Sequence, residues 1–136
     1  MPDTIRKADY YYVTAPDKAG EGARIFGALR TAGVNLLAVH AFPSARKSQI
    51  DVVPADAVAF LAAAKSAGLK LSKPKTVFLI EGDDRVGALA PTLARLGAAG
   101  INVTAVSAVR TGSGRYGALL WVKPRDVMKA AETLGA

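Results

Sequence analysis

The sequence predicts an α+β fold made of two consecutive repeats, each an antiparallel sheet with helices on one face. Three observations support this prediction. The 136-residue chain matches itself at a spacing of 67 residues, as from Asp17 to Asp84. Each half alternates short apolar runs with segments of helical periodicity. The first such segment of each half follows an Asp-x-x-Gly sequence and ends at a glycine.

Similar residues recur in the same order along the two halves. The pairs at this spacing are Asp17 and Asp84, Gly20 and Gly87, Gly33 and Gly100, Asn35 and Asn102, and Ala41 and Ala108. Farther on, the spacing becomes 70, from Pro54 to Pro124, which indicates a three-residue insertion near Gly112–Gly114, and insertions belong in turns. We therefore expect a first repeat over residues 1–72, a linker over 73–75 and a second repeat over 76–136.

The first repeat is expected to begin with a strand over residues 10–13. Asp17 is expected to cap a helix that Gly33 ends, and strands over 36–42 and 49–53 follow as a hairpin. Asp56 is expected to cap a second helix, and residues 69–71 supply a short last strand. The apolar helix faces are Ile25, Phe26, Leu29 and Ala32, then Phe60, Leu61 and Ala64.

The sequence of the second repeat predicts the same order of elements. A strand over 76–80 leads to a helix capped by Asp84 and ended by Gly100, then to strands over 103–109 and 116–122, and then to a helix capped by Asp126. The apolar helix faces are Val86, Leu89, Leu93 and Leu96, then Val127, Ala131 and Leu134. No segment follows that could form the last strand, so the second repeat is expected to lack it.

The first strands of both repeats are apolar on both faces. Residues 10–13 and 77–80 lack the alternation that one solvated face would produce. A covered sheet is therefore expected, through a homodimer or through packing of one repeat on the other. The missing last strand would leave residues 76–80 at an edge, which strand exchange, the N-terminal segment or a second subunit could fill.

The composition narrows the possible functions. The chain has no cysteine and one histidine, His40, so thiolate chemistry, disulfides and the usual zinc sites are excluded, and no catalytic residue, metal or cofactor is expected. No run approaches the roughly 18 apolar residues of a membrane span, and the charged N-terminal segment is unlike a signal peptide. A cytoplasmic protein without a membrane partner is expected. The net charge of +7 favours anionic partners without choosing among them.

An apolar strand, Asp-x-x-Gly, a helix, and then Gly, Val or Ile, and Asn before the next strand resemble the ACT domain family. The matching residues are Asp17, Gly20, Gly33, Val34 and Asn35, then Asp84, Gly87, Gly100, Ile101 and Asn102. The resemblance covers nearly the whole chain. It implies ferredoxin-like βαββαβ modules that associate side by side, bind amino acids at their interfaces and regulate amino-acid metabolism. The absent last strand departs from that pattern and puts any assumed dimer geometry in doubt.

The loops before the first helices are the candidate ligand sites. Their backbone amides and the helix dipole would suit a carboxylate, and the glycines would allow close approach. The resemblance adds the asparagines at the start of the next strand. The candidate residues are Asp17, Gly20, Asn35, Asp84, Arg85, Val86, Gly87 and Asn102. Read singly, these residues are as well explained as caps and turn formers; read together, they favour the second loop.

Other interpretations remain open at this point. His40 and its counterpart Ser107 could line a cavity, although a single strand histidine is more often only hydrogen-bonded. Gly112–Gly114 lacks the lysine and helix of a phosphate loop and indicates a flexible turn. Residues 114–121 loosely resemble a strand of an RNA-recognition motif, but Tyr116 and Trp121 should point to opposite faces. A small enzyme of the same fold is a further alternative, but no acid and base are paired in this sequence at a spacing typical of a catalytic motif.

The sequence therefore predicts a non-catalytic regulatory module that binds an amino acid or a similar metabolite. A homodimer and a regulated partner protein are expected, and nucleic acid is disfavoured. The alternatives are an RNA-binding module of related topology and a protein-interaction module without a ligand.

Overall fold

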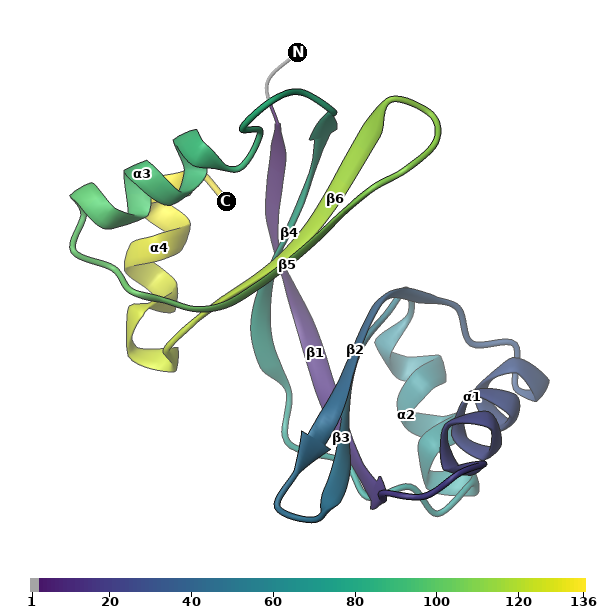
Figure 1. The fold of residues 1–136 in the computed structure, drawn as a ribbon. Coiled ribbons are helices and arrows are strands. Elements are labelled where there is room, and N and C mark those ends of the chain that lie inside the picture. Colours follow the sequence, from purple (N-terminus) through teal and green to yellow (C-terminus); the bar gives the residue numbers. More distant parts are fainter. Residues whose placement is uncertain (1–2) are drawn as a thin grey trace. The chain divides into compact units, whose positions relative to one another are not determined.

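The computed structural model describes residues 3–136, which form two compact units (Figure 1). One unit contains residues 9–75. The other contains residues 76–136 together with the N-terminal residues up to Ala8. These units differ from the expected boundaries, because the N-terminal segment groups with the second repeat and residues 73–75 group with the first. Below, the two are called the first-repeat unit and the second-repeat unit.

The first-repeat unit has helices on one face of an antiparallel sheet. Its elements are β1 (Thr4–Pro16), α1 (Glu21–Thr31), β2 (Leu36–Ser44), β3 (Lys47–Pro54) and α2 (Ala57–Ser66). The strand order is β2-β3-β1, and Val13 of β1 forms an antiparallel bridge with Leu71. The short last strand expected over 69–71 is thus present as a single bridge, supported by a bond from the Ser72 amide to the Tyr12 carbonyl.

Apolar residues from all these elements form the core of the first-repeat unit. Ile25 and Leu29 of α1 and Phe60 and Ala64 of α2 are buried, as their helical spacing predicts. They pack on Tyr11, Val13, Ala15, Ile50 and Val52, which alternate along β1 and β3. Ala32 and Leu61, expected on the buried faces, are exposed.

The second-repeat unit repeats this architecture. Its elements are β4 (Lys75–Asp83), α3 (Ala90–Ala98), β5 (Val103–Arg110), β6 (Arg115–Val122), a short 3₁₀ turn η1 (Pro124–Asp126) and α4 (Val127–Leu134). β4 pairs with β6, and β6 pairs with β5, both antiparallel. Phe78, Ile80, Leu96 and Leu120 form the centre of its core, and α4 adds Ala131 and Leu134.

The N-terminal part of β1 fills the edge that the missing last strand would leave. β1 lies next to β4 in the strand order, and Ile5 packs against the second-repeat core. Of the three ways expected to cover this edge, the structure thus uses the N-terminal segment. β1 supplies Thr4–Ala8 to the second-repeat unit and the rest of the strand to the first-repeat unit.

The helix ends match the predictions at the glycines and at one aspartate. Gly33 and Gly100 follow α1 and α3 with φ of 73° in both cases, a left-handed conformation that glycine adopts readily. Asp56 caps α2, because its side chain accepts a hydrogen bond of 3.2 Å from the Ala59 amide.

The predicted capping roles of three other aspartates are wrong. α1 begins at Glu21 and α3 begins at Ala90, so the residues at their N-caps are Gly20 and Leu89. Asp17 and Asp84 lie too far upstream to reach the free amides. Asp126 stands at the start of α4 without a side-chain capping bond, since the preceding 3₁₀ turn leaves it in helical conformation.

The late start of α3 also corrects one predicted core residue. Val86 lies in the loop and is fully exposed, and Leu93 is partly exposed, whereas Leu96 is completely buried. On β1 and β4, successive residues Tyr10 and Tyr11, and Val77 and Phe78, are all buried, so both faces of these strands contain covered side chains as predicted. No helix in the part of the chain that the structure describes is long and apolar enough to span a membrane.

Candidate functional site

The loop between β1 and α1 in the first-repeat unit is open and exposed. Gly20 has φ of 92°, and the Asp17 carboxylate accepts a hydrogen bond of 3.2 Å from Ser48 Oγ at the start of β3. Pro16 lies opposite Lys47, so the tip of the β2–β3 hairpin stands beside this loop. The predicted residues Asp17 and Gly20 are therefore together, next to a basic hairpin.

The corresponding loop of the second-repeat unit runs over residues 84–89. Gly87 has φ of 68°, the Asp84 amide donates to the Gly114 carbonyl (2.9 Å), and the Asp84 carboxylate pairs with Arg110 at 2.7 Å. The second hairpin thus also stands beside its loop. Asp84, Arg85, Val86 and Gly87 are close together, as expected, but Asp84 is engaged with Arg110.

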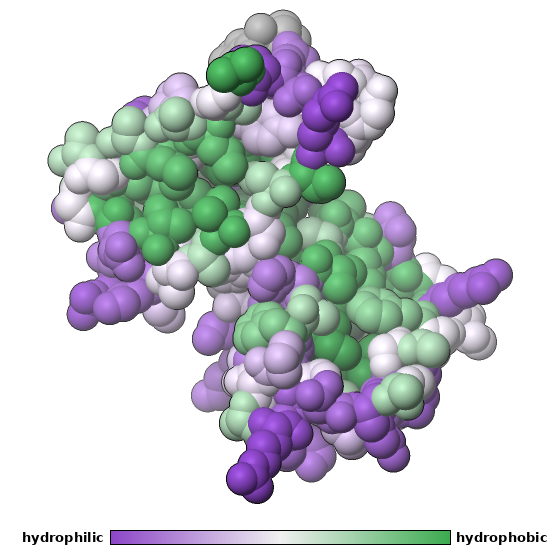
Figure 2. Space-filling view, in the orientation of Figure 1, coloured by the Kyte–Doolittle hydropathy of each residue, from purple (hydrophilic) through white to green (hydrophobic). Residues whose placement is uncertain are grey.

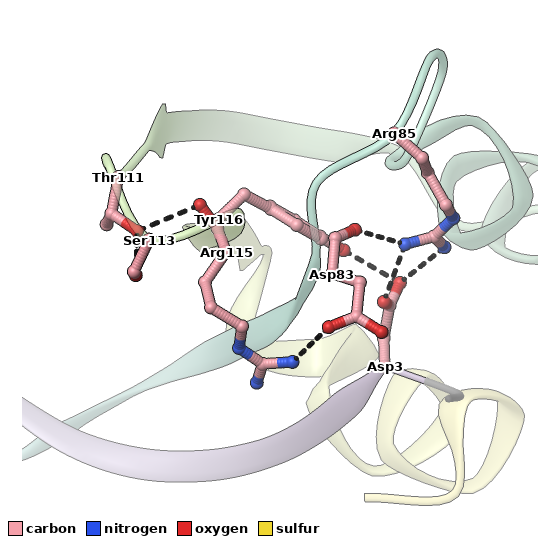
Figure 3. A network of polar contacts seen from close by, with 7 residues as sticks. All are labelled: Asp3, Asp83, Arg85, Thr111, Ser113, Arg115 and Tyr116. Atoms are coloured by element: carbon pink, nitrogen blue, oxygen red, sulfur yellow. Dashed lines mark hydrogen bonds and ion pairs between the residues drawn. The ribbon is translucent and has the colours of Figure 1, made fainter.

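Arg85 holds a carboxylate of the same chain (Figure 3). Its two terminal nitrogens donate to Asp3 Oδ1 at 3.1 Å and to Asp3 Oδ2 at 3.2 Å. The Tyr116 hydroxyl donates to Asp3 Oδ2 at 2.7 Å. Arg85 is also fixed by the Asp83 carbonyl at 2.8 Å. We call Gly82, Arg85 and Tyr116 the carboxylate niche.

Gly82 provides the space for this contact. A Cβ at position 82 would overlap Oδ1 of Asp3, so any other residue here would force the Asp3 side chain to move. Gly82 lies opposite Tyr116 in the β4–β6 pair, and the Asp3 side chain is only 10% exposed. Close to it, Arg115 pairs with Asp83 at 2.8 Å.

The electrostatics match this geometry. The hydrogen bonds from Arg85 hold the pKa of Asp3 below its usual value, against the opposing effect of burial. Burial, and then the neighbouring Asp3, raise the pKa of Tyr116 to about 12. At neutral pH the niche therefore contains an ionised carboxylate, a guanidinium and a neutral phenol that donates a proton.

The two predicted asparagines lie at the other end of their units. Asn35 directly precedes Leu36, which pairs with Pro54, whereas the Asp17 loop adjoins the opposite end of β3 at Lys47. Asn102 precedes Val103, which pairs with Val122, while the second loop adjoins Arg115. Each separation is a strand of eight residues, or about 25 Å. Neither unit brings its loop and its asparagine together.

Sequence reasoning missed the residues around Arg85. Asp3 precedes β1, Gly82 lies on β4, and Arg115 and Tyr116 lie on β6, and the contact between Asp3 and Tyr116 spans 113 positions. One signal was available, because the counterpart of Gly82 at the 67-residue spacing is Ala15. A glycine inside an apolar strand often marks close approach of another group.

Two other features do not form sites. A shallow groove between α1 and α2 is lined mainly by alanines and by Gly27, Thr31 and Ser66, with Arg24 as its one charged residue. Among residues 3–136, no group of three or more His, Cys, Asp or Glu is placed to hold a metal ion. The His40 ring lies 5.2 Å from the Phe42 ring at an interplanar angle of 50°, and His40 is opposite Asp51 in the β2–β3 pair.

Comparison with known proteins identifies the fold. No protein-family model matches the sequence, and no curated protein matches it. A solved protein of Bacteroides thetaiotaomicron is similar over 96% of this chain and 88% of its own, with 19% identity and a TM-score of 0.82. The regulatory subunit of aspartate kinase from Thermus thermophilus, in its ligand-free form, is similar over 99% and 95%, with 14% identity and a TM-score of 0.63.

A structure of aspartokinase alpha and beta subunits is similar over 98% of this chain and 95% of that one, with 19% identity and a TM-score of 0.59. At such low sequence identity, these structural similarities establish the fold of this chain but not its ligand. With two βαββα units whose sheets are each completed by a further segment of the chain, this protein has a tandem ACT-domain fold.

Proposed function

We propose that this protein is a non-catalytic regulatory module that binds an amino acid or a similar small metabolite. The observation that carries the proposal is the pair of loops before α1 and α3. Each has a left-handed glycine and exposed backbone, and each lies beside a hairpin that carries basic residues. The fold is shared with regulatory subunits of aspartate kinase, which supports a regulatory role.

A site that used both a loop and an asparagine could form between two copies of the chain. Within one unit these groups are about 25 Å apart, too far for one amino acid to touch both. We therefore include a homodimer in the proposal, with the loop of one copy facing an asparagine of the other.

The outer strands are the surfaces that favour such a dimer. β2 and β5 each end the strand order, and neither has a charged residue before its last position. Their exposed apolar side chains include Val39 of β2 (44% exposed) and Val109 of β5 (67% exposed). Uncharged apolar edges of this length favour pairing with another strand.

A protein-interaction module without a ligand is the second candidate, and helix surfaces favour it. Val58 on α2 and Met128 on α4 are strongly exposed, and Figure 2 shows hydrophobic residues gathered over α3 and α4. The RNA-binding alternative loses support. Tyr116 and Trp121, the aromatics that would stack bases, are both buried, and Tyr116 is bonded to Asp3.

Thermal unfolding against the twenty amino acids tests the ligand. A ligand that binds only the native state should raise its stability by about 2.7 kcal/mol at a hundredfold excess over its dissociation constant. If the asparagines complete the site, Asn35→Ala and Asn102→Ala should remove a selective rise in stability. Asn35→Asp and Asn102→Asp should strengthen contact with the amine of a bound amino acid and weaken contact with its carboxylate. No response to any amino acid would favour the interaction module.

Sedimentation velocity tests the dimer. Val39→Glu places a charge on the edge at β2, and Val109→Glu does the same at β5. The substitution on the edge that forms the interface should convert the dimer to a monomer. Val58→Glu is the matched control, because it adds the same charge to an exposed helix position. A wild-type monomer at all concentrations would remove the dimer from the proposal.

A further inference from the structure

The carboxylate niche exists in only one of the two repeats. At the 67-residue spacing, Gly82 corresponds to Ala15, and Arg85 corresponds to Lys18. The cross-strand partner of Ala15 is Ser48, whereas that of Gly82 is Tyr116. The first-repeat unit therefore has a methyl group, a lysine and a serine where the second has a glycine without a side chain, a guanidinium and a phenol.

The segments that cover the two equivalent edges also differ. In the first-repeat unit this segment is 69–71, whose Leu69 and Leu71 pack against the core. In the second-repeat unit it is the start of β1, which contributes apolar Ile5 to the core but ends in the carboxylate of Asp3. A strand that served only to cover an edge would not require an acid at this position.

The three groups of the niche form a recognition site for a carboxylate. A guanidinium that donates to both carboxylate oxygens is a strong and directional contact, and a phenol donor adds to it. The niche lies where the β4–α3 loop begins, since Gly82 is the next-to-last residue of β4 and Arg85 lies in the loop. These features are the ones expected for the carboxylate of a small ligand.

We propose that the niche is a ligand site that the chain itself occupies with Asp3, so that a free carboxylate compound binds there by displacing the N-terminal segment. This deepens the proposed function, on which the identification of the compound as an amino acid rests. The first-repeat loop has no such occupant in its own unit. The two repeats are thus unequal, one open and one held closed by its own chain.

The displacement has a defined structural consequence. Loss of the Asp3 contacts frees Asp3 and Thr4, and the edge of β4 then loses the start of its neighbouring strand. Binding at the niche would therefore be coupled to release of the N-terminal segment. This coupling lowers the apparent affinity of the ligand by the fraction of molecules in which the niche is open.

Removal of Asp3 and addition of a simple carboxylate test this inference. In full-length Asp3→Ala, sodium acetate should raise Tm in a saturable way, and sodium chloride at equal ionic strength should not. Wild type should need at least about tenfold more acetate for the same shift, because Asp3 competes for Arg85. Asp3→Ala combined with Arg85→Gln should lose the response, and Asp9→Ala, which removes an exposed acid from β1, should match wild type.

If the alanine variant folds poorly, Asp3→Asn provides a variant of nearly unchanged shape. It should also reach half-saturation at a lower acetate concentration than wild type. Equal responses to acetate and chloride, or equal half-saturation in wild type and both variants, would overturn the inference. If an amino acid still stabilises wild type in that case, the proposed function stands with its site elsewhere. An acetate response in Asp3→Ala without any amino-acid response would reject the amino acid and keep the niche.

Discussion

Two residues in the turn between β2 and β3 hold backbone conformations that most side chains disfavour. Ala45 has φ of 50° and Arg46 has φ of 67°, and Ser44 pairs with Lys47 across this two-residue turn. The left-handed region costs an ordinary residue roughly 1 kcal/mol, and Asn-Gly is the preferred sequence for such turns. Ala45→Asn with Arg46→Gly should therefore raise the free energy of unfolding by about 1 kcal/mol.

Urea denaturation would measure this gain. The control is Ser113→Gly in the second hairpin, where φ is not positive and glycine should give no gain. A decrease in stability of the Asn-Gly variant would show that Arg46 makes contacts worth more than the backbone strain.

Asp51 on β3 gives a second prediction at the scale of one residue. Burial raises the pKa of its carboxyl, against the hydrogen bond from Gln49 (3.0 Å) and the charges of His40 and Lys75. A carboxyl whose pKa is raised by folding destabilises the folded state when ionised, and this cost disappears as the pH falls through the folded pKa. Asp51→Asn, which keeps an acceptor for Gln49, should therefore be more stable than wild type at pH 7.

The difference should shrink steadily toward pH 4, and thermal unfolding at several pH values would follow it. Asp9→Asn makes the same change of net charge at an exposed position of β1 and should not reproduce this pH dependence. A variant that is less stable than wild type at pH 7 would mean that the ionised Asp51 is favourably paired.

Helix caps give a prediction at the scale of an element. Asp56→Ala removes the acceptor for the Ala59 amide and should cost about 1 kcal/mol. Asp126→Ala should cost much less, because Asp126 caps no amide, and Asp17→Ala should lose only an exposed bond to Ser48. Equal losses in all three variants, measured by urea denaturation, would contradict this ranking.

The same residues show what the sequence can and cannot predict about the elements. The glycine-ended helices and most strands are predictable because they depend on local periodicity and on single left-handed positions such as Gly33 and Gly100, but β1 begins at Thr4, six residues before the strand predicted over 10–13. The predicted starts of α1 and α3 are three and five residues too early, since Asp17 and Asp84 have good capping chemistry but the N-caps are Gly20 and Leu89. In the structure, Asp17 instead accepts a hydrogen bond from Ser48, and Asp84 forms an ion pair with Arg110.

The candidate site was less predictable than the fold. The loops at Gly20 and Gly87 follow from the repeat, but the carboxylate niche joins β1 to β4 and β6 across most of the chain. A spacing argument relates equivalent positions in two repeats. It cannot reveal Asp3, which has no equivalent in the second repeat, nor can it show that Asn35 and Asn102 lie a strand's length from their loops.

At the scale of the whole molecule, the start of β1 stabilises a unit whose other elements lie more than 65 residues later in the chain. Deletion of residues 1–8 would remove the neighbour of β4 and the packing of Ile5, so β4 amides should exchange with solvent much faster. The β2–β3 pair should keep its protection, because its core contains no residue before Tyr11. Hydrogen exchange would separate the two responses, with Ile5→Ala as a milder variant. Equal loss of protection in both units would show that the chain unfolds as one cooperative body, and the second-repeat unit would then not depend on the N-terminal strand in particular.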